Sequence, residues 1–162
     1  MDNSQTLIAA IFDGWHAYQS QLTQAIAPLG AEQLLLPAAT GLRTVGQIAT
    51  HVIGARARWF RMLLGEGGDV FEALGGWDRP GQQARTAEEL VYGLETTWAG
   101  MHEAIGRWTP EQWADTWPGE DDSEPALITR HWVIWHLIEH DLHHGGEISL
   151  TLGANGILAL QL

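Results

Sequence analysis

Four segments of the chain repeat apolar residues every three or four positions, the spacing that gathers side chains on one face of an α-helix. They span residues 4–27, 45–64 and 86–108, and a fourth segment starts near residue 129. Pro28 and Gly30 end the first segment, and Gly153 lies near the end of the last. Because no segment alternates as strands do, the pattern predicts an all-α fold.

Capping residues mark where two of these helices begin. Thr44 with Gln47 and Thr86 with Glu89 fit the capping box, in which two side chains satisfy the exposed backbone donors of a helix N-terminus. Between these helices lies the glycine-rich segment 65–85, the longest connection in the chain. A connection of that length is typical of a functional lid or a mobile segment.

Four amphipathic helices in 162 residues predict an antiparallel four-helix bundle that forms one domain over residues 1–162. The long connection between the second and third helices leaves room for a crossover, in place of simple up-down-up-down order. Thr109 followed by Pro110 predicts a short extra helix after the third.

Composition excludes several classes of function. Twenty acidic residues against eight basic ones, all arginine, give a net charge of -12, which argues against binding nucleic acid or anionic membranes. With no cysteine, the chain offers neither a disulfide nor a thiolate ligand. The N-terminal segment lacks a basic region, and no apolar run reaches 18 residues, so we expect a cytoplasmic protein without a signal peptide or a membrane span.

Histidines are concentrated in one stretch of the fourth helix. Five of the eight lie between residues 131 and 144. At about 100° per residue, with His136 at zero, His140 lies at roughly 40° and His144 at roughly 80°, whereas the apolar arc spans roughly 60° to 240°. We therefore expect His140 and His144 at the border of the core, and His136 and His143 toward solvent.

Two imidazoles four residues apart on a helix can chelate one metal ion, and a third ligand is normally required. His51 lies at the edge of the buried stripe of the second helix and is the best third candidate. Trp132 and Trp135 flank the histidine face, and one of them is a candidate wall for the pocket. The competing interpretation is that His140 and His144 are hydrogen-bonded core residues.

Charged residues near this face have two interpretations each. Asp141 falls in the apolar arc, where an unpaired carboxylate is costly; it either orients a ligand imidazole or pairs with Arg56. Arg56, Arg58 and Arg61 line the second helix, where they either attract a carboxylate-bearing substrate or form salt bridges with the abundant acids.

Two stretches resemble the DinB-like (DinB/YfiT-like) family of metalloenzymes. TVGQIATHVIGARARWF, residues 44–60, is similar to the second helix of the family with its single histidine, and WHLIEHDLHHGGEISLTLG, residues 135–153, is similar to its fourth-helix signature. Helix order and length match over nearly the whole chain. By this resemblance the metal triad of the family falls on His51, His140 and His144, the three that the angular argument selects.

The resemblance implies a four-helix bundle, often a homodimer, that holds a divalent ion, zinc or nickel, near one end. Characterised relatives use a low-molecular-weight thiol such as bacillithiol or mycothiol. The resulting hypothesis is a metal-dependent S-transferase that activates an exogenous thiol for attack on a small electrophile. The alternatives are a metal-dependent hydrolase using water, a non-enzymatic bundle with a structural metal, and a binding module using the tryptophan-rich cleft.

The sequence departs from the family after the last histidine. Many members carry Arg and Gln there, whereas this chain has Gly145, Gly146 and Glu147. Glu147 is therefore a candidate for substrate binding or proton transfer, and Glu139 is the second candidate for proton transfer; each has a surface carboxylate as its alternative.

Overall fold

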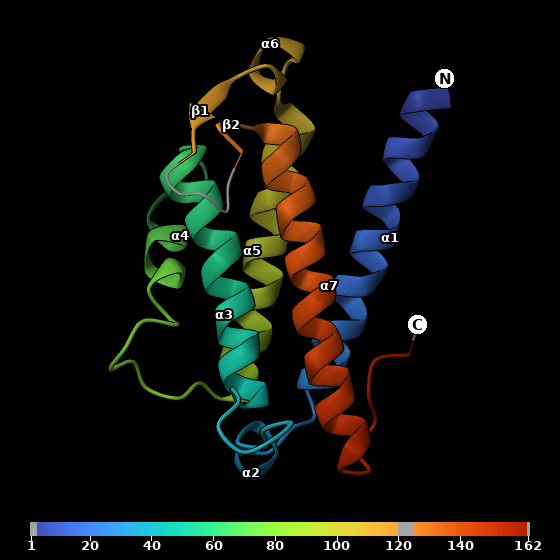
Figure 1. Cartoon of the computed structure of the whole chain (residues 1–162), viewed down its shortest axis with the longest axis vertical. Helices are drawn as coiled ribbons and strands as arrows, with labels where there is room; N and C mark the ends of the chain where they lie inside the picture. The colour runs from blue at the N-terminus through green and yellow to red at the C-terminus, as the bar shows by residue number, and fades with distance from the viewer. Residues whose placement is uncertain (1–2, 120–124, 162) are drawn as a thin grey trace.

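The computed structural model describes residues 3–119 and 125–161 (Figure 1). Its long helices are α1 (Asn3–Ile26), α3 (Val45–Arg58), α5 (Ala87–Arg107) and α7 (Arg130–Ala154). The shorter elements are α2 (Ala31–Leu34), the π-helical turn η1 (Trp59–Leu63), α4 (Gly68–Gly75), α6 (Pro110–Trp113) and the strands β1 (Thr116–Pro118) and β2 (Leu127–Thr129).

The four long helices form the expected four-helix bundle. Helix α3 packs against α5 and α7, and α1 packs against the same two helices, so the four enclose one core. Figure 1 shows α1 and α7 running in one direction and α3 and α5 in the other. The connection between α3 and α5 is therefore a crossover that leaves these two neighbours parallel, and the arrangement is not uniformly antiparallel.

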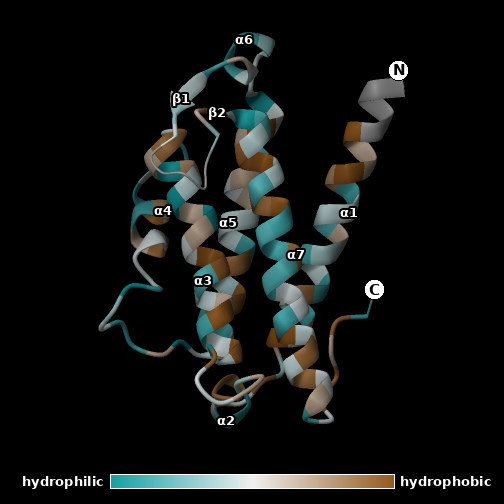
Figure 2. Ribbon diagram, viewed as in Figure 1, coloured by the Kyte–Doolittle hydropathy of each residue, from teal (hydrophilic) through white to brown (hydrophobic). Residues whose placement is uncertain are grey.

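Part of this long connection is helical, where the sequence predicts only a lid or a mobile segment. Helix α4 packs along α3 and η1, with Phe71 and Leu74 buried. Gly67 precedes α4 with φ 78°, and a Cβ there would lie 2.2 Å from the Phe71 ring. Glycine is required at this position by both conditions. Residues 76–86 return without regular structure to the start of α5, and Figure 2 shows that this return is mostly hydrophilic.

A small β-hairpin joins α6 to α7, although the sequence shows no strand pattern. Strands β1 and β2 are antiparallel, with Thr116 opposite Thr129. Each has three residues, which is too short for alternation to be recognised. The acidic segment 120–124 (EDDSE) lies outside the described residues.

The predicted caps are present. The Thr44 hydroxyl accepts the Gln47 N–H at 3.3 Å, and the Gln47 side chain accepts the Thr44 N–H at 2.9 Å. Thr86 and Glu89 repeat this box, and Thr109 heads α6 as predicted. These boxes fix where α3 and α5 begin, and thereby the rotation of the residues that follow.

The core lies where the inward faces of the long helices meet, and Figure 2 shows apolar positions interleaved with polar ones along each of them. The apolar stripe of α1 is buried at Trp15, Leu22 and Ile26, but Ile8 is 53% exposed and Ile11 47%. The first turns of α1 thus continue the pattern beyond the core. Among the described residues, no helix has both the length and the apolar character needed to cross a bilayer.

Candidate metal centre

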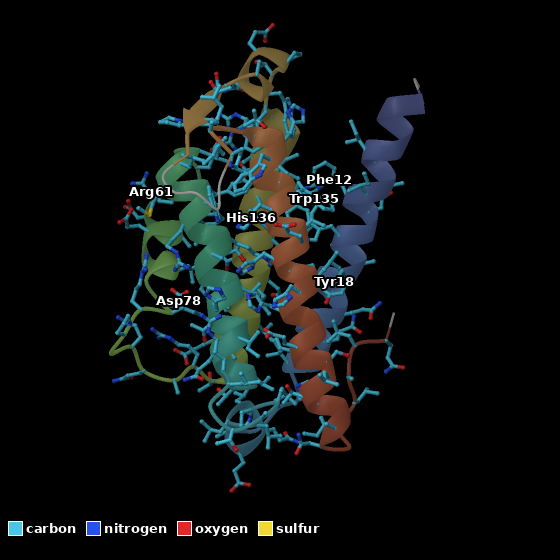
Figure 3. All side chains as sticks on the ribbon, in the orientation of Figure 1. Phe12, Tyr18, Arg61, Asp78, Trp135 and His136 are labelled. Atoms are coloured by element: carbon cyan, nitrogen blue, oxygen red, sulfur yellow. The ribbon has the colours of Figure 1, made fainter. Side chains whose placement is uncertain are left out.

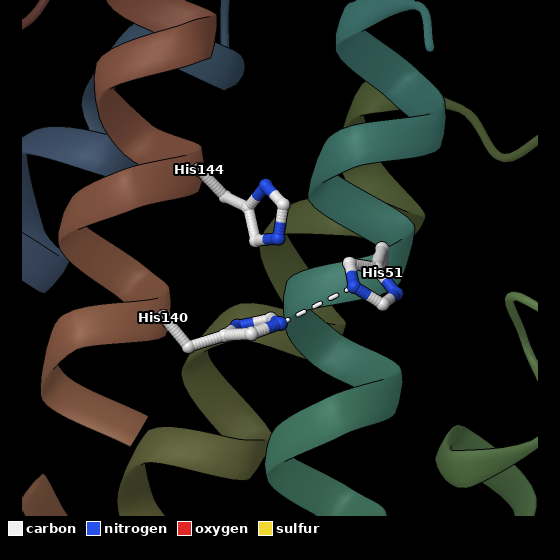
Figure 4. Close-up of side chains that lie close together, drawn as sticks. All are labelled: His51, His140 and His144. Atoms are coloured by element: carbon white, nitrogen blue, oxygen red, sulfur yellow. Dashed lines mark hydrogen bonds between the residues drawn. The ribbon is translucent and has the colours of Figure 1, made fainter. Parts of the chain in front are cut away.

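Three imidazoles converge between α3 and α7. His51 projects from α3, and His140 and His144 project from successive turns of α7 (Figure 4). The Nε2 atoms of His51 and His140 are 3.2 Å apart, and one nitrogen from each of the three rings lies within 4.8 Å of the others. The structure brings together the three histidines that the sequence selects.

Carboxylates orient two of these rings. The Nδ1 N–H of His51 donates to Asp78 Oδ2 at 2.9 Å, and that of His144 donates to Glu147 Oε2 at 2.6 Å. Both contacts place the proton on Nδ1, so Nε2 of each ring is left with its lone pair. This is the tautomer that a metal ligand needs.

His140 has no such partner. Its Nδ1 is buried without a hydrogen-bond partner in the described chain. Burial, followed by the nearby His144 and His51, lowers the pKa of His140 to about 3. Burial also lowers the pKa of His144, partly offset by its bond to Glu147. At neutral pH both rings are therefore uncharged, which is the form that binds a metal.

The donor set fits a divalent ion of the zinc type. Two nitrogens that each bind zinc at about 2.0–2.1 Å in tetrahedral geometry are about 3.3 Å apart. The 3.2 Å between the Nε2 atoms of His51 and His140 matches that distance. With the His51 proton held on Nδ1, these two nitrogens face each other either across one shared proton or across a cation. Three neutral imidazoles leave further coordination positions open.

Asp78 contacts the triad, which the sequence analysis does not predict. It lies in the turn after α4, on the side of α3 away from α7 (Figure 3). Arg58 donates Nη1 to its Oδ1 at 2.5 Å and Nη2 to its Oδ2 at 2.9 Å. Burial raises the pKa of Asp78, but the hydrogen bonds from Arg58 and His51 outweigh burial and hold the pKa below its ordinary value. Asp78 is thus a fixed anion behind His51.

Asp141 takes the second of its two predicted roles. It is completely buried, Arg56 Nη2 donates to its Oδ2 at 2.6 Å, and Trp15 Nε1 donates to the same oxygen at 2.7 Å. It therefore ties α1, α3 and α7 together and does not orient a ligand. Arg58 pairs with Asp78 and Arg61 with Glu72, so all three arginines of this segment form salt bridges.

Aromatic side chains extend along the seam from His140. His136, expected toward solvent, is only 27% exposed, because its ring stacks on Trp132 at 4.9 Å and meets the edge of Trp59 at 5.2 Å. Trp132 is thus the tryptophan beside the histidines. Trp135 is 59% exposed and lies on the α1 side of α7 (Figure 3).

The two predicted proton-transfer residues lie in different surroundings. Glu147 contacts His144 directly, and its Oε1 lies 3.7 Å from Nε2 of the exposed His143. These three residues form a second group of potential ligands, but that group shares His144 with the triad. Glu139 is bonded to Nδ1 of His136 at 3.2 Å.

The two glycines that follow His144 have different environments. A Cβ on Gly145 would lie 2.1 Å from the Tyr18 hydroxyl, whereas one on Gly146 would meet nothing within 4 Å. Gly145 therefore permits Tyr18 of α1 to pack directly on α7, where its hydroxyl donates to the Leu142 carbonyl at 3.3 Å. Gly146 is exposed, and no neighbouring side chain requires a glycine there.

Comparison with known proteins agrees with this architecture. A crystal structure of a DinB-like protein from Bacillus cereus ATCC 10987 superposes with a TM-score of 0.72 at 19% identity, covering 96% of this chain and 97% of that one. YfiT from Bacillus subtilis, described as a probable metal-dependent hydrolase with an unusual four-helix bundle topology, gives 0.66 at 18% identity, covering 90% and 88%. No curated protein sequence matches significantly. The model of the DinB family matches residues 1–158, and the chain belongs to that family.

Proposed function

We propose that the protein is a metal-dependent hydrolase, with His51, His140 and His144 as the metal ligands. The observation that carries the proposal is the convergence of nitrogen atoms from three imidazoles within 4.8 Å on a helix seam. The description of YfiT, which shares the fold, as a probable metal-dependent hydrolase supports this choice of reaction.

A divalent ion bound by such a triad supplies Lewis acidity and brings the pKa of water near neutrality. The remaining requirement is a group that accepts the water proton. Two carboxylates contact the triad, those of Asp78 and Glu147. Asp78 is 13% exposed and both of its oxygens accept hydrogen bonds, whereas Glu147 is 42% exposed and Oε1 is not hydrogen bonded to a described residue.

We therefore assign proton transfer to Glu147 Oε1, while its Oε2 holds His144. Glu147→Gln should reduce kcat by about 10²–10⁴-fold, the usual contribution of a general base. The assay uses saturating metal, because the same substitution removes the carboxylate that holds His144. Glu103→Gln is the matched control, because this glutamate is 81% exposed and pairs with Arg107. A Glu139→Gln variant tests the other candidate, and a larger loss there would transfer the role to Glu139.

The thiol transferase remains the second candidate for the same three ligands. A triad of neutral nitrogens with open positions accepts a thiolate as readily as water, and an ion lowers the pKa of a bound thiol. Because the chain has no cysteine, the thiol has to be a cosubstrate such as bacillithiol or mycothiol.

The deciding experiment is elemental analysis of the purified protein, followed by two assays with zinc or nickel. One assay follows hydrolysis of p-nitrophenyl esters, and the other follows monochlorobimane conjugation with a panel of small thiols. Metal-dependent ester hydrolysis without thiol supports the hydrolase, and turnover only with thiol supports the transferase. Bound metal without either activity would favour the third interpretation, a non-enzymatic bundle in which the ion is structural.

The ligand assignment has its own test. His51→Ala, His140→Ala and His144→Ala should each lose bound metal, and full metal content in all three would contradict the triad. His102→Ala is the control, because His102 is exposed and its ring lies against Trp98 in a different part of the bundle.

We also propose that the protein is a homodimer. Large apolar side chains are exposed on α1 and α7, among them Ile11, Trp135 and Leu142. Covering such side chains favours association. Sedimentation velocity should give twice the 17.8 kDa chain mass, and a single species at 17.8 kDa would contradict this.

A further inference from the structure

A large cavity lies beside the metal centre. It has a volume of about 1020 Å³ and is enclosed by α2, the first turns of α3 and the return segment between α4 and α5. His51 and Asp78 both line it, and no residue of α7 does, so the cavity meets the histidine triad at His51. Its size is that of a small-molecule site.

The charge on its walls is opposite to that of the protein. Six of the eight arginines form ion pairs with described carboxylates. The other two, Arg43 and Arg79, have no ion-pair partner among the described residues, and both line this cavity. In a chain with 20 acidic residues and a net charge of -12, exposed arginines without a carboxylate partner are unexpected.

The remaining charged groups in the cavity leave this positive character in place. Asp78 is neutralised by Arg58, and Glu88 is the other lining carboxylate. Arg85 also lines the cavity; its guanidinium lies 4.4 Å from the Trp77 ring centroid and pairs with Glu89. Apart from the paired Asp78 and Arg85, the lining therefore carries two guanidinium groups and one carboxylate.

The backbone holds both unpaired arginines in place. The Arg79 N–H donates to the Gly76 carbonyl at 3.2 Å, and the Arg79 carbonyl accepts from Gln82 at 3.3 Å. Arg43 immediately precedes the cap of α3, where Thr44 bridges to Pro37. Only the side chains have to be ordered when a ligand binds, which reduces the entropic cost of binding.

We propose that this cavity binds the anionic group, a carboxylate or a phosphate, of a small substrate whose reacting group lies at the three histidines. Guanidinium groups bind both kinds of oxyanion through paired hydrogen bonds. Arg43, just before α3, and Arg79, after α4, both line the cavity. The inference rests on the proposed function, because it names the substrate class of that same site.

The test separates anion binding from catalysis. Calorimetry measures binding of glutarate and of inorganic phosphate, with uncharged glutaramide as the comparison, to zinc-loaded and zinc-free protein. We expect glutarate or phosphate to bind both forms, and the double variant Arg43→Gln/Arg79→Gln to weaken binding at least tenfold. Arg61→Gln is the matched control, because Arg61 pairs with Glu72 and does not line the cavity.

Three results would overturn the inference: no binding of either anion, equal binding of glutaramide, or an unchanged Kd in the double variant. Preference for phosphate over glutarate, or the reverse, identifies which oxyanion the arginines take. If the double variant keeps its Kd in the zinc-loaded form but does not bind the anion in the zinc-free form, the anion binds to the metal and not to the arginines.

Ester assays connect the cavity to the reaction. The double variant should raise KM for mono-p-nitrophenyl glutarate at least tenfold, leaving kcat within about twofold, with no change for the neutral p-nitrophenyl butyrate. Anion binding without metal-dependent hydrolysis would refute the proposed function and retain the cavity. If the KM for hydrolysis depends neither on the charge of the ester nor on the arginine substitutions, anion binding by the cavity is refuted and the proposed function is retained.

Discussion

The three ligand imidazoles are held by three different means. His51 is fixed by Asp78, which Arg58 holds in turn, and His144 is fixed by Glu147 on its own helix. His140 has no carboxylate behind it, since its Nδ1 has no partner in the described chain, and it contacts His51 through Nε2. A carboxylate behind a ligand histidine fixes its tautomer and strengthens the ligand, so His51 and His144 should carry most of the metal affinity.

Asp78→Asn should weaken metal binding by about 10–100-fold, because the amide removes the negative charge behind His51 while preserving its size. Competition with a chromogenic chelator measures the affinity. Asp13→Asn is the control, since Asp13 is exposed on α1 and far along the chain from the triad. Equal affinity in Asp78→Asn and the wild type would show that Asp78 does not act through His51.

The adjacent glycines of α7 should respond in opposite ways to the same substitution. Gly146→Ala should stabilise the protein by up to about 1 kcal/mol, because alanine is the better helix former and the position is open. Gly145→Ala should destabilise it, because the Cβ would displace the buried Tyr18.

Urea unfolding followed by tryptophan fluorescence compares the two variants. A stabilising Gly145→Ala would mean that Tyr18 moves aside without loss, and that the close packing of α1 on α7 at this point is not required.

At the scale of the elements, the parts that local rules govern were predictable. Capping boxes and apolar spacing locate α3, α5 and α7, and the angular position of His140 and His144 at the core border follows from helix geometry alone. Placing His51 required the rotation of the second helix, α3, and the apolar stripe of that helix gave its rotation.

Features that depend on contacts between elements could not be predicted from the sequence. Asp78 meets His51 only because α4 folds back along α3, and no periodicity in the glycine-rich connection encodes that return. His136 lies outside the apolar arc, yet Trp59 on the neighbouring helix covers it. Residue angles around one helix do not include side chains of another helix, such as Trp59.

Three long helices share one buried ion pair, and its loss should be costly. Asp141→Asn leaves the Arg56 guanidinium buried without a counter-charge and weakens the bond from Trp15, so we expect a loss of about 3–5 kcal/mol in unfolding free energy. The double variant Arg56→Met/Asp141→Leu should lose less than Asp141→Asn, because no charge is then left buried.

Chemical denaturation of both variants gives the comparison, with Asp13→Asn again as the exposed control. A double variant less stable than Asp141→Asn would mean that the ion pair stabilises the packing of α1, α3 and α7 beyond satisfying its own charges.

For the molecule as a whole, the histidines couple stability to pH. In the metal-free folded chain the pKa of His140 is about 3, against 6.5 for the free side chain. Between these values the unfolded chain binds a proton that the folded chain does not, so stability rises with pH and falls as pH is lowered from about 6.5. The lowered pKa of His144 acts in the same direction, and that of Asp78 adds a loss at still lower pH.

Without metal, the unfolding free energy should therefore decrease steadily from pH 7 to pH 4, by at most about 1.4 kcal/mol per pH unit for each histidine that stays unprotonated. Zinc should raise stability most at pH 7, and this gain should shrink on acidification because protons compete for the same nitrogens. Urea titrations in chelator and in zinc at each pH measure both effects. His140→Gln should show a shallower dependence in chelator, and a slope equal to that of the wild type would mean that His140 is protonated in the folded protein.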